Sequence, residues 1–222
     1  MLPDLPQTEA AIIEMTNAFR KDSALQQVRP NSALAAAARA FAEYLAKTGK
    51  FAHDADGSGP ADRVTAHGYR YCLVAENLAL HLDSRGFESR QLAGEMVEGW
   101  KTSPGHRENL LLPGATDIGV AVVRVAYKHP KYVSVQLFGR PESLKVTFSI
   151  QNQSGKAVYY KLGGETDRLA PRETASYSHC NPRQLSVDRP GEAPARFDPR
   201  NGDHFVVRAG AGRAILVDVE RK

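Results

Sequence analysis

The chain has 222 residues, 42% hydrophobic and 24% charged, enough for one large or two modest globular domains, and no apolar stretch is long enough to span a membrane. The net charge of +4 lies in the C-terminal third, where residues 144–222 hold 13 Lys and Arg against 9 Asp and Glu. Because this excess is small and forms no basic run, it argues against nucleic-acid binding.

Three helices are predicted in the first part of the chain. Residues 8–28 carry apolar side chains at helical spacing, with Thr8 as the expected N-cap. Residues 32–47 form a second amphipathic stretch that Asn31 or Ser32 can cap and that a glycine ends. Residues 60–68 begin with proline and end with glycine, which is typical of a short helix.

Strands and helices then alternate. Residues 71–80 have the apolar density of a buried strand, and residues 89–101 have a helical apolar stripe. Ser103 precedes a proline and is the expected N-cap of another short helix. Two apolar runs, 117–127 and 131–139, flank a short turn and predict a hairpin of buried strands.

The pattern predicts an α+β chain of two domains, residues 1–142 and 143–222. Helices before and between strands predict a helix-covered sheet over residues 8–140. After Pro141 the helical periodicity ends, and Gly, Pro and Asn turns separate strand-like stretches, which predicts a small all-β, sandwich-like accessory domain. Its expected strands are residues 144–150, 157–162, 174–179, 203–209 and 213–220.

Three residues of the first domain have side chains suited to chemistry. His53 follows a helix in a polar loop, and Glu76 interrupts an apolar strand, where a carboxylate needs a partner or an open cleft. His106 falls in the first turn after Ser103, where the helix dipole disfavours a charged imidazole. A neutral ring there can accept a proton or bind a metal. Taken singly, each of the three also fits an ordinary structural role.

Seven segments over residues 10–140 resemble, in order and spacing, the bacterial SCP-like members of the CAP superfamily (cysteine-rich secretory, antigen 5 and pathogenesis-related-1 proteins). The longest is WKTSPGHRENLL at residues 100–111. The others are NAFR (17–20), FAHD (51–54), ADRV (61–64), AENLA (75–79), TDIGV (116–120) and VQLFG (135–139).

The resemblance implies an α/β/α sandwich whose central cleft holds two histidines and two acidic residues. His53, Glu76 and His106 match three of these positions, and they are the expected cleft residues. Ser103 stands where the second acidic residue would be, so the cleft departs from the full tetrad. Tyr69 is expected to pack beside the cleft.

Three activities follow as alternatives for this cleft. His53, His106 and Glu76 are a reasonable ligand set for Zn²⁺ or another divalent cation, whose bound water could act in hydrolysis with Glu76 and His106 as catalytic candidates. Ser58 or Ser103 could act as a metal-free nucleophile, although neither lies in a nucleophile-elbow pattern. The resemblance favours the third alternative, a binding module for a lipid, a peptide or a cell-wall-derived ligand that requires no cofactor.

Arg20 and Arg63 are expected to brace the fold through carboxylate or carbonyl contacts. Cys72 and Cys180 can form a disulfide between the domains or remain two thiols.

No signal peptide is visible at the start of the sequence, so the chain is either cytosolic or a mature fragment. The resemblance favours a secreted, periplasmic or envelope-associated protein. The basic bias of residues 144–222 allows weak contact with an anionic surface, such as a wall polymer, or simply a solvated exterior.

Overall fold

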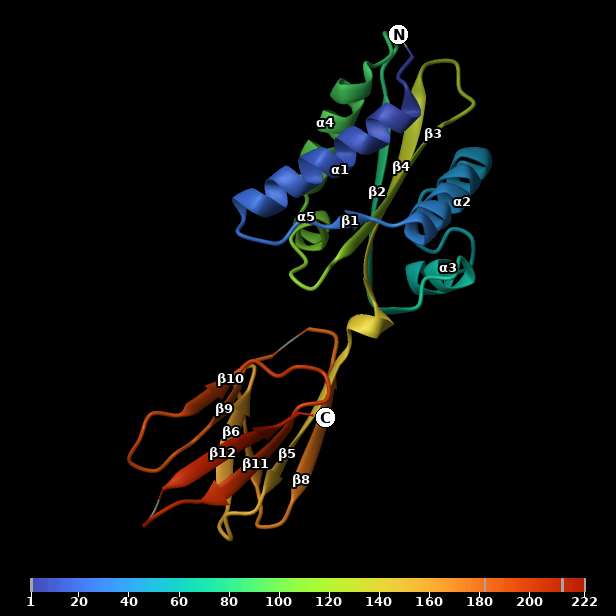
Figure 1. Ribbon diagram of the computed structural model, residues 1–222. Coiled ribbons are helices and arrows are strands. Elements are labelled where there is room, and N and C mark those ends of the chain that lie inside the picture. Colours follow the sequence, from blue (N-terminus) through green and yellow to red (C-terminus); the bar gives the residue numbers. More distant parts are fainter. Residues whose placement is uncertain (1, 182, 213, 222) are drawn as a thin grey trace. The chain divides into compact units, whose positions relative to one another are not determined.

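The computed structural model describes residues 2–181, 183–212 and 214–221 (Figure 1). The chain divides into two compact units, residues 1–143 and 144–222. The first unit contains helices and a sheet, and the described part of the second contains strands, so the predicted α+β class is confirmed. Arg213, the first residue of one predicted strand, lies outside the described residues.

A four-stranded sheet forms the centre of the first unit. Its order is β1-β3-β4-β2, built from Arg29–Pro30, Asp117–Arg124, Lys131–Pro141 and Tyr71–Leu82 in that order. The hairpin of β3 and β4 and the pairing of β2 with β4 are antiparallel, whereas β1 is parallel to β3. The strand β2 is therefore an outer strand, with its other edge unpaired in this sheet.

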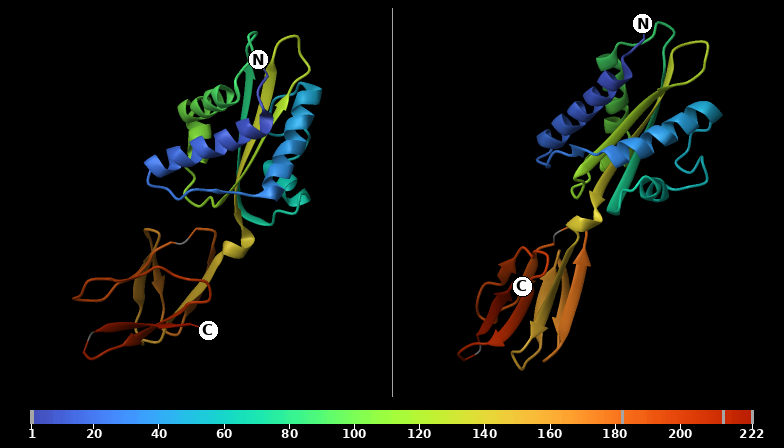
Figure 2. Two further views of the ribbon diagram at one scale, coloured as in Figure 1. Left: turned by 45° about the horizontal axis from the view of Figure 1, so that its top comes forward. Right: turned by 45° about the vertical axis from the view of Figure 1, so that its right-hand side comes forward.

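Helices cover both faces of this sheet, as the views in Figures 1 and 2 show. The helices α1 (Leu5–Asp22), α4 (Ser89–Thr102) and α5 (Pro104–Leu110) share one apolar core with the sheet. The helices α2 (Ser32–Thr48) and α3 (Pro60–Ala66) share the other. The predicted three-layer α/β/α arrangement is confirmed.

Local capping explains where the first two helices begin. The prediction that Thr8 caps α1 is wrong: Asp4 is the N-cap and accepts a hydrogen bond from the Gln7 amide at 2.8 Å. Thr8 lies inside the helix, where its buried hydroxyl donates to the Asp4 carbonyl. The helix α2 starts as predicted, because the Asn31 side chain accepts from two backbone amides. It ends at Gly49, whose φ of 71° favours glycine.

One glycine sets how closely α2 approaches the sheet. A Cβ atom on Gly119 of β3 would lie 2.2 Å from the carbonyl carbon of Leu34, which begins the buried face of α2. Only the absence of a side chain permits this approach. Arg20 braces the opposite layer as expected, since its buried guanidinium donates to the carbonyls of Leu110 and Leu112.

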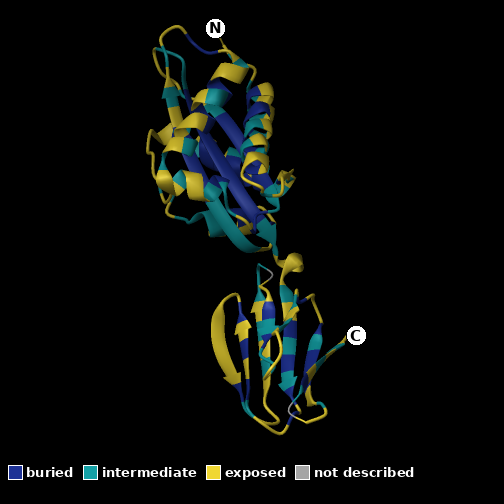
Figure 3. Ribbon diagram, turned by 90° about the vertical axis from the view of Figure 1, so that its left-hand side faces the viewer, coloured by how far each residue is buried: buried dark blue, intermediate teal, exposed yellow. Residues whose placement is uncertain are grey.

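The second unit is built from two four-stranded sheets, as the sandwich-like prediction requires. Their facing side chains form one apolar core, and buried residues alternate with more exposed ones along Val146–Asn152 and Val158–Leu162 (Figure 3). One sheet has the order β12-β11-β5-β8, from Ile215–Glu220, His204–Ala209, Val146–Asn152 and Thr174–His179. The other has the order β10-β9-β6-β7, from Ala195–Phe197, Leu185–Val187, Val158–Leu162 and Glu165–Leu169.

The strands β7, β9 and β10 were not predicted from the sequence. Two of them have three residues, and β7 buries only its last residue, Leu169, so none shows a readable alternation. Both cysteines, Cys72 and Cys180, are disulfide-bonded, which excludes the alternative of two thiols. No helix among the described residues combines the length and apolar character that crossing a membrane requires.

Candidate functional site

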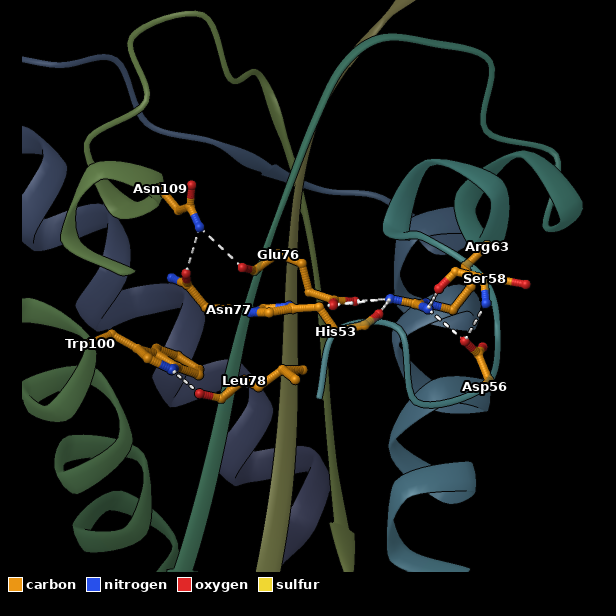
Figure 4. Close-up of polar contacts among 9 residues, drawn as sticks. All are labelled: His53, Asp56, Ser58, Arg63, Glu76, Asn77, Leu78, Trp100 and Asn109. Atoms are coloured by element: carbon orange, nitrogen blue, oxygen red, sulfur yellow. Dashed lines mark hydrogen bonds and ion pairs between the residues drawn. The ribbon is translucent and has the colours of Figure 1, made fainter. Parts of the chain in front are cut away.

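Glu76 lies on β2 with its carboxylate almost fully buried. Arg63 of α3 donates from Nη2 to both carboxylate oxygens, at 3.0 Å and 2.8 Å (Figure 4). Burying a carboxylate costs several kcal/mol unless it is paired, and here one guanidinium nitrogen contacts both carboxylate oxygens inside the protein. The sequence-based expectation that Glu76 needs a partner is therefore met by Arg63.

The Arg63 guanidinium is itself held on several sides. It donates to the Asp56 carboxylate at 2.9 Å and to the carbonyls of Ser58 and His53 at 2.7 Å and 2.9 Å. It also stacks over the Phe41 ring of α2, 3.5 Å from the ring centroid. These contacts fold the loop between α2 and α3 around one buried cation, and they carry His53 to the edge of β2.

His53 connects the buried carboxylate to the solvent. Its Nδ1 lies 2.8 Å from Oε1 of Glu76, and its side chain is 53% exposed whereas that of Glu76 is 1% exposed. A carboxylate paired with a guanidinium only accepts hydrogen bonds, so Nδ1 carries the proton. In the neutral ring Nε2 is then an acceptor that no side chain among the described residues occupies.

His106 approaches from the opposite helical layer, in the first turn of α5. Burial lowers its pKa, and the nearby charge of His53 lowers it further, so the two imidazoles are within electrostatic range. The neutral ring was expected from the helix dipole, but the main cause is burial. Ser103 is the N-cap residue of α5, as predicted, although its side chain makes no capping hydrogen bond.

Asparagine side chains fix α5 against β2. Asn109 donates to the Glu76 carbonyl at 3.0 Å and to the Asn77 side-chain oxygen at 2.9 Å (Figure 4). Asn77 in turn donates to the His106 carbonyl at 3.2 Å and to Gln136 at 3.0 Å. The backbone of His106 is thus tied to the strand residue that follows Glu76.

The alternation of β2 explains how both layers contribute. Glu76 and Leu78 face α2 and α3, whereas Asn77 and Ala79 face α1, α4 and α5. Because β2 is an outer strand, side chains from the two layers can meet around its unpaired edge. We call this group, His53, Arg63, Glu76 and His106, the β2 edge site.

The structure brings three of the predicted site residues together and leaves others apart. His53 and Glu76 are hydrogen-bonded, and the charge of His53 lowers the pKa of His106. Tyr69 does not join them, because its buried hydroxyl donates to Asp117 at 2.7 Å and its ring packs on Gly139. Among the described residues, the Ser58 hydroxyl is not hydrogen-bonded to either imidazole.

A divalent cation does not fit the arrangement of Glu76. Both of its oxygens accept from Arg63, and a guanidinium at hydrogen-bonding distance repels a second cation. Over the part of the chain that the structure describes, no three His, Cys, Asp or Glu side chains are grouped so that they could hold a metal ion. Two imidazoles without the carboxylate are fewer protein ligands than catalytic zinc sites have.

Two contributions to the site were missed from the sequence. Arg63 was expected to brace the fold, but nothing in its spacing identified Glu76 as its partner 13 residues later. Asn109 lies in the segment of residues 100–111 that resembles the family, and the resemblance assigns it no role. The available signal was Asn77. A polar residue that directly follows Glu76 and precedes an apolar run indicates a hydrogen-bonding partner in the second helical layer.

Comparison with known proteins places the first unit in a family. The family model for the cysteine-rich secretory protein family (CAP) matches residues 13–138, more than half of the chain. The uncharacterized protein YkwD of Bacillus subtilis is 31% identical over 116 residues, which are 52% of this chain and 42% of that protein. This chain therefore spans less than half the length of that curated relative.

Two solved structures have the same fold in their matching part. An outer surface protein from Borrelia burgdorferi has a TM-score of 0.52 at 21% identity, covering 60% of this chain and 92% of that one. An extracellular protein containing an SCP domain, from Bacillus anthracis, has a TM-score of 0.50 at 25% identity, covering 61% and 41%. With its family match, its three-layer first unit and the shared fold, the chain belongs to the CAP family of cysteine-rich secretory proteins.

Proposed function

We propose that this protein is a secreted or envelope-associated binding protein that holds a cell-wall-derived ligand at the β2 edge site. The observation that carries the proposal is the neutralisation of Glu76 by Arg63 inside the protein. The carboxylate therefore orients His53 instead of meeting the ligand directly. What reaches the solvent is an imidazole held at Nδ1, with Nε2 as a hydrogen-bond acceptor.

The chemistry of the site favours a polar ligand. A fixed acceptor at His53 and a second, neutral imidazole at His106 complement hydroxyl and amide N–H groups. Wall glycans and their peptides carry both groups, whereas a lipid tail carries neither. The location is supported by the similar SCP-domain protein, which is extracellular, and by the disulfide-bonded cysteines, which are typical of oxidising compartments.

Calorimetric titration with soluble peptidoglycan fragments tests this proposal. Loss of one specific hydrogen bond should weaken binding about tenfold in His53→Ala. His129→Ala removes a histidine from the loop between β3 and β4 and should leave the affinity unchanged. If the fragments do not bind, or if both variants bind equally well, the proposal fails.

A hydrolase is the opposing outcome, with or without a metal ion. The test is turnover of ester or peptide substrates, measured with and without added Zn²⁺. Turnover that Glu76→Gln abolishes would replace the binding proposal by the enzymatic one. We expect no turnover, because Arg63 donates to both oxygens of Glu76 and the 1% exposed carboxylate is kept away from a substrate.

A further inference from the structure

The sheet β10-β9-β6-β7 of the second unit carries a row of cationic and hydroxyl side chains that crosses its strands. The antiparallel register places Arg196 opposite Ser186, and Ser186 opposite Lys161. Lys161 is in turn opposite Thr166 of β7. Since neighbouring strands lie about 4.8 Å apart, the row of four residues extends over roughly 14 Å. We call these four residues the cationic row.

The cationic row lies on the outer face of its sheet. On β6, Lys161 lies between Tyr160 and Leu162, which are both buried in the core of the second unit. On β9, Ser186 lies between two buried residues in the same way. Because side chains alternate along a strand, the row points to the solvent.

The surface is hollowed along this row. A hollow of about 360 Å³ is lined by residues from β6, β9, β10 and the turns that join the strands. Its lining residues are Lys161, Gly163, Gly164, Gln184, Ser186 and Arg196. Two cations, a hydroxyl and a side-chain amide therefore face one concavity, and all four groups can donate hydrogen bonds.

The two cations of the hollow are not paired with a carboxylate of the part of the chain that the structure describes. Among the described residues, neither Lys161 nor Arg196 forms an ion pair, and neither does Arg168, which lies opposite Tyr159 on the same sheet. The carboxylates of Asp188 and Asp198 follow the ends of β9 and β10, and neither lines the hollow. The positive field at the row is thus left for a partner.

We propose that the cationic row binds a linear polyanion, a polymer that carries phosphate or carboxylate groups along its chain. Lys161 and Arg196 are two strands apart, so they are held about 10 Å from each other with a hydroxyl between them. A line of donors along a hollow suits an extended chain. A single exposed ion pair contributes little, so repeated anionic groups are needed for useful affinity.

This proposal is independent of the β2 edge site and is tested on the full chain. Binding of inorganic polyphosphate and of polygalacturonate is measured by calorimetry, with neutral dextran as a blank. The two polyanions separate phosphate from carboxylate recognition, and binding of either one supports the proposal. We expect Lys161→Ala with Arg196→Ala to weaken binding roughly tenfold and to flatten its salt dependence.

A charge-matched variant distinguishes binding at the cationic row from diffuse electrostatic attraction to the protein. Lys145→Ala with Lys156→Ala removes the same net charge at exposed positions outside the row, and it should change affinity less than about twofold. Equal losses in the two double variants would overturn the proposal. It would equally be overturned if neither polymer bound, or if only vesicles of phosphatidylglycerol bound, since a planar surface would then be the partner.

Discussion

Arg63 and Glu76 form a buried ion pair in which the guanidinium side chain is 6% exposed and the carboxylate side chain 1% exposed. The pair joins α3 to the outer strand β2. It also fixes His53, because one carboxylate oxygen accepts from both the guanidinium and the imidazole. An internal charge pair thus determines which group the protein presents at this edge.

Removing the cation should destabilise the first unit strongly. Arg63→Met leaves the buried Glu76 carboxylate unpaired, and we expect a loss of about 3–5 kcal/mol in the free energy of unfolding. Urea denaturation followed by Trp100 fluorescence measures it, because this single tryptophan is buried in the first unit. The exposed pair of Arg90 with Glu14 is the control, and Arg90→Ala should lower the stability far less, because an exposed ion pair contributes little.

The double variant identifies the cause. Arg63→Met combined with Glu76→Leu removes both charges, so part of the lost stability should return. If the free energy of unfolding lost in the double variant equals the sum of the losses in the two single variants, the ion pair is not the reason for the loss.

His106 should titrate below the ordinary histidine pKa of about 6.5. The unfolded chain then binds the proton more readily than the native protein does. The stability contributed by the neutral ring is present above the unfolded pKa, and it falls as pH drops from there to the native pKa. NMR titration of the ring protons measures the native value directly.

The charge of His53 is the smaller cause of this lowered pKa, which gives a matched test. His53→Ala should raise the His106 pKa part of the way, since burial remains, and His129→Ala should not change it. A native pKa at or above about 6.5 would contradict the assignment.

Zinc titration distinguishes the contribution of the two imidazoles to Zn²⁺ affinity from that of the Glu76 carboxylate. Because Glu76 is engaged by Arg63, Glu76→Gln should leave any Zn²⁺ affinity within about twofold, whereas His106→Ala should weaken it about tenfold. Calorimetry of the three proteins in parallel makes the comparison. A tenfold loss in Glu76→Gln would show that the carboxylate is a ligand after all.

The contact between α2 and β3 should not tolerate a methyl group. Gly119→Ala places a Cβ against the backbone of Leu34, and we expect a loss of about 3 kcal/mol. Gly99→Ala on the exposed face of α4 meets no atom within 4 Å and should stabilise the helix by about 0.5–1 kcal/mol. Thermal unfolding of both variants tests the pair, and similar melting temperatures would be evidence against the close approach.

The features that the sequence predicted well are local. Asn31 and Gly49 bound α2 because capping depends on a few adjacent residues. The hairpin of β3 and β4 follows from two apolar runs and a short turn. Thr8 was the wrong cap because Asp4, followed by a proline at the helix start, offers a better acceptor one turn earlier.

The features that were missed depend on contacts distant in sequence. The strand β7 exists because its backbone pairs with β6, while its own side chains are mostly exposed. Likewise, Arg63 reaches Glu76 only after α3 packs on the sheet, and no local pattern records that contact. The resemblance to CAP domains identified His53, Glu76 and His106 as a group. It did not indicate that the guanidinium of Arg63 pairs with the Glu76 carboxylate.

The consecutive residues Glu76 and Asn77 have a consequence for how β2 can change during evolution or engineering. Deleting one residue between Leu73 and Glu76, where the pairing with β4 is regular, would send the carboxylate toward α5 and the amide toward Arg63. Both helical layers would then lose their polar partners in a single step. The length of β2 between Leu73 and Asn77 should therefore be nearly invariant among functional variants of this chain, even where its residues differ.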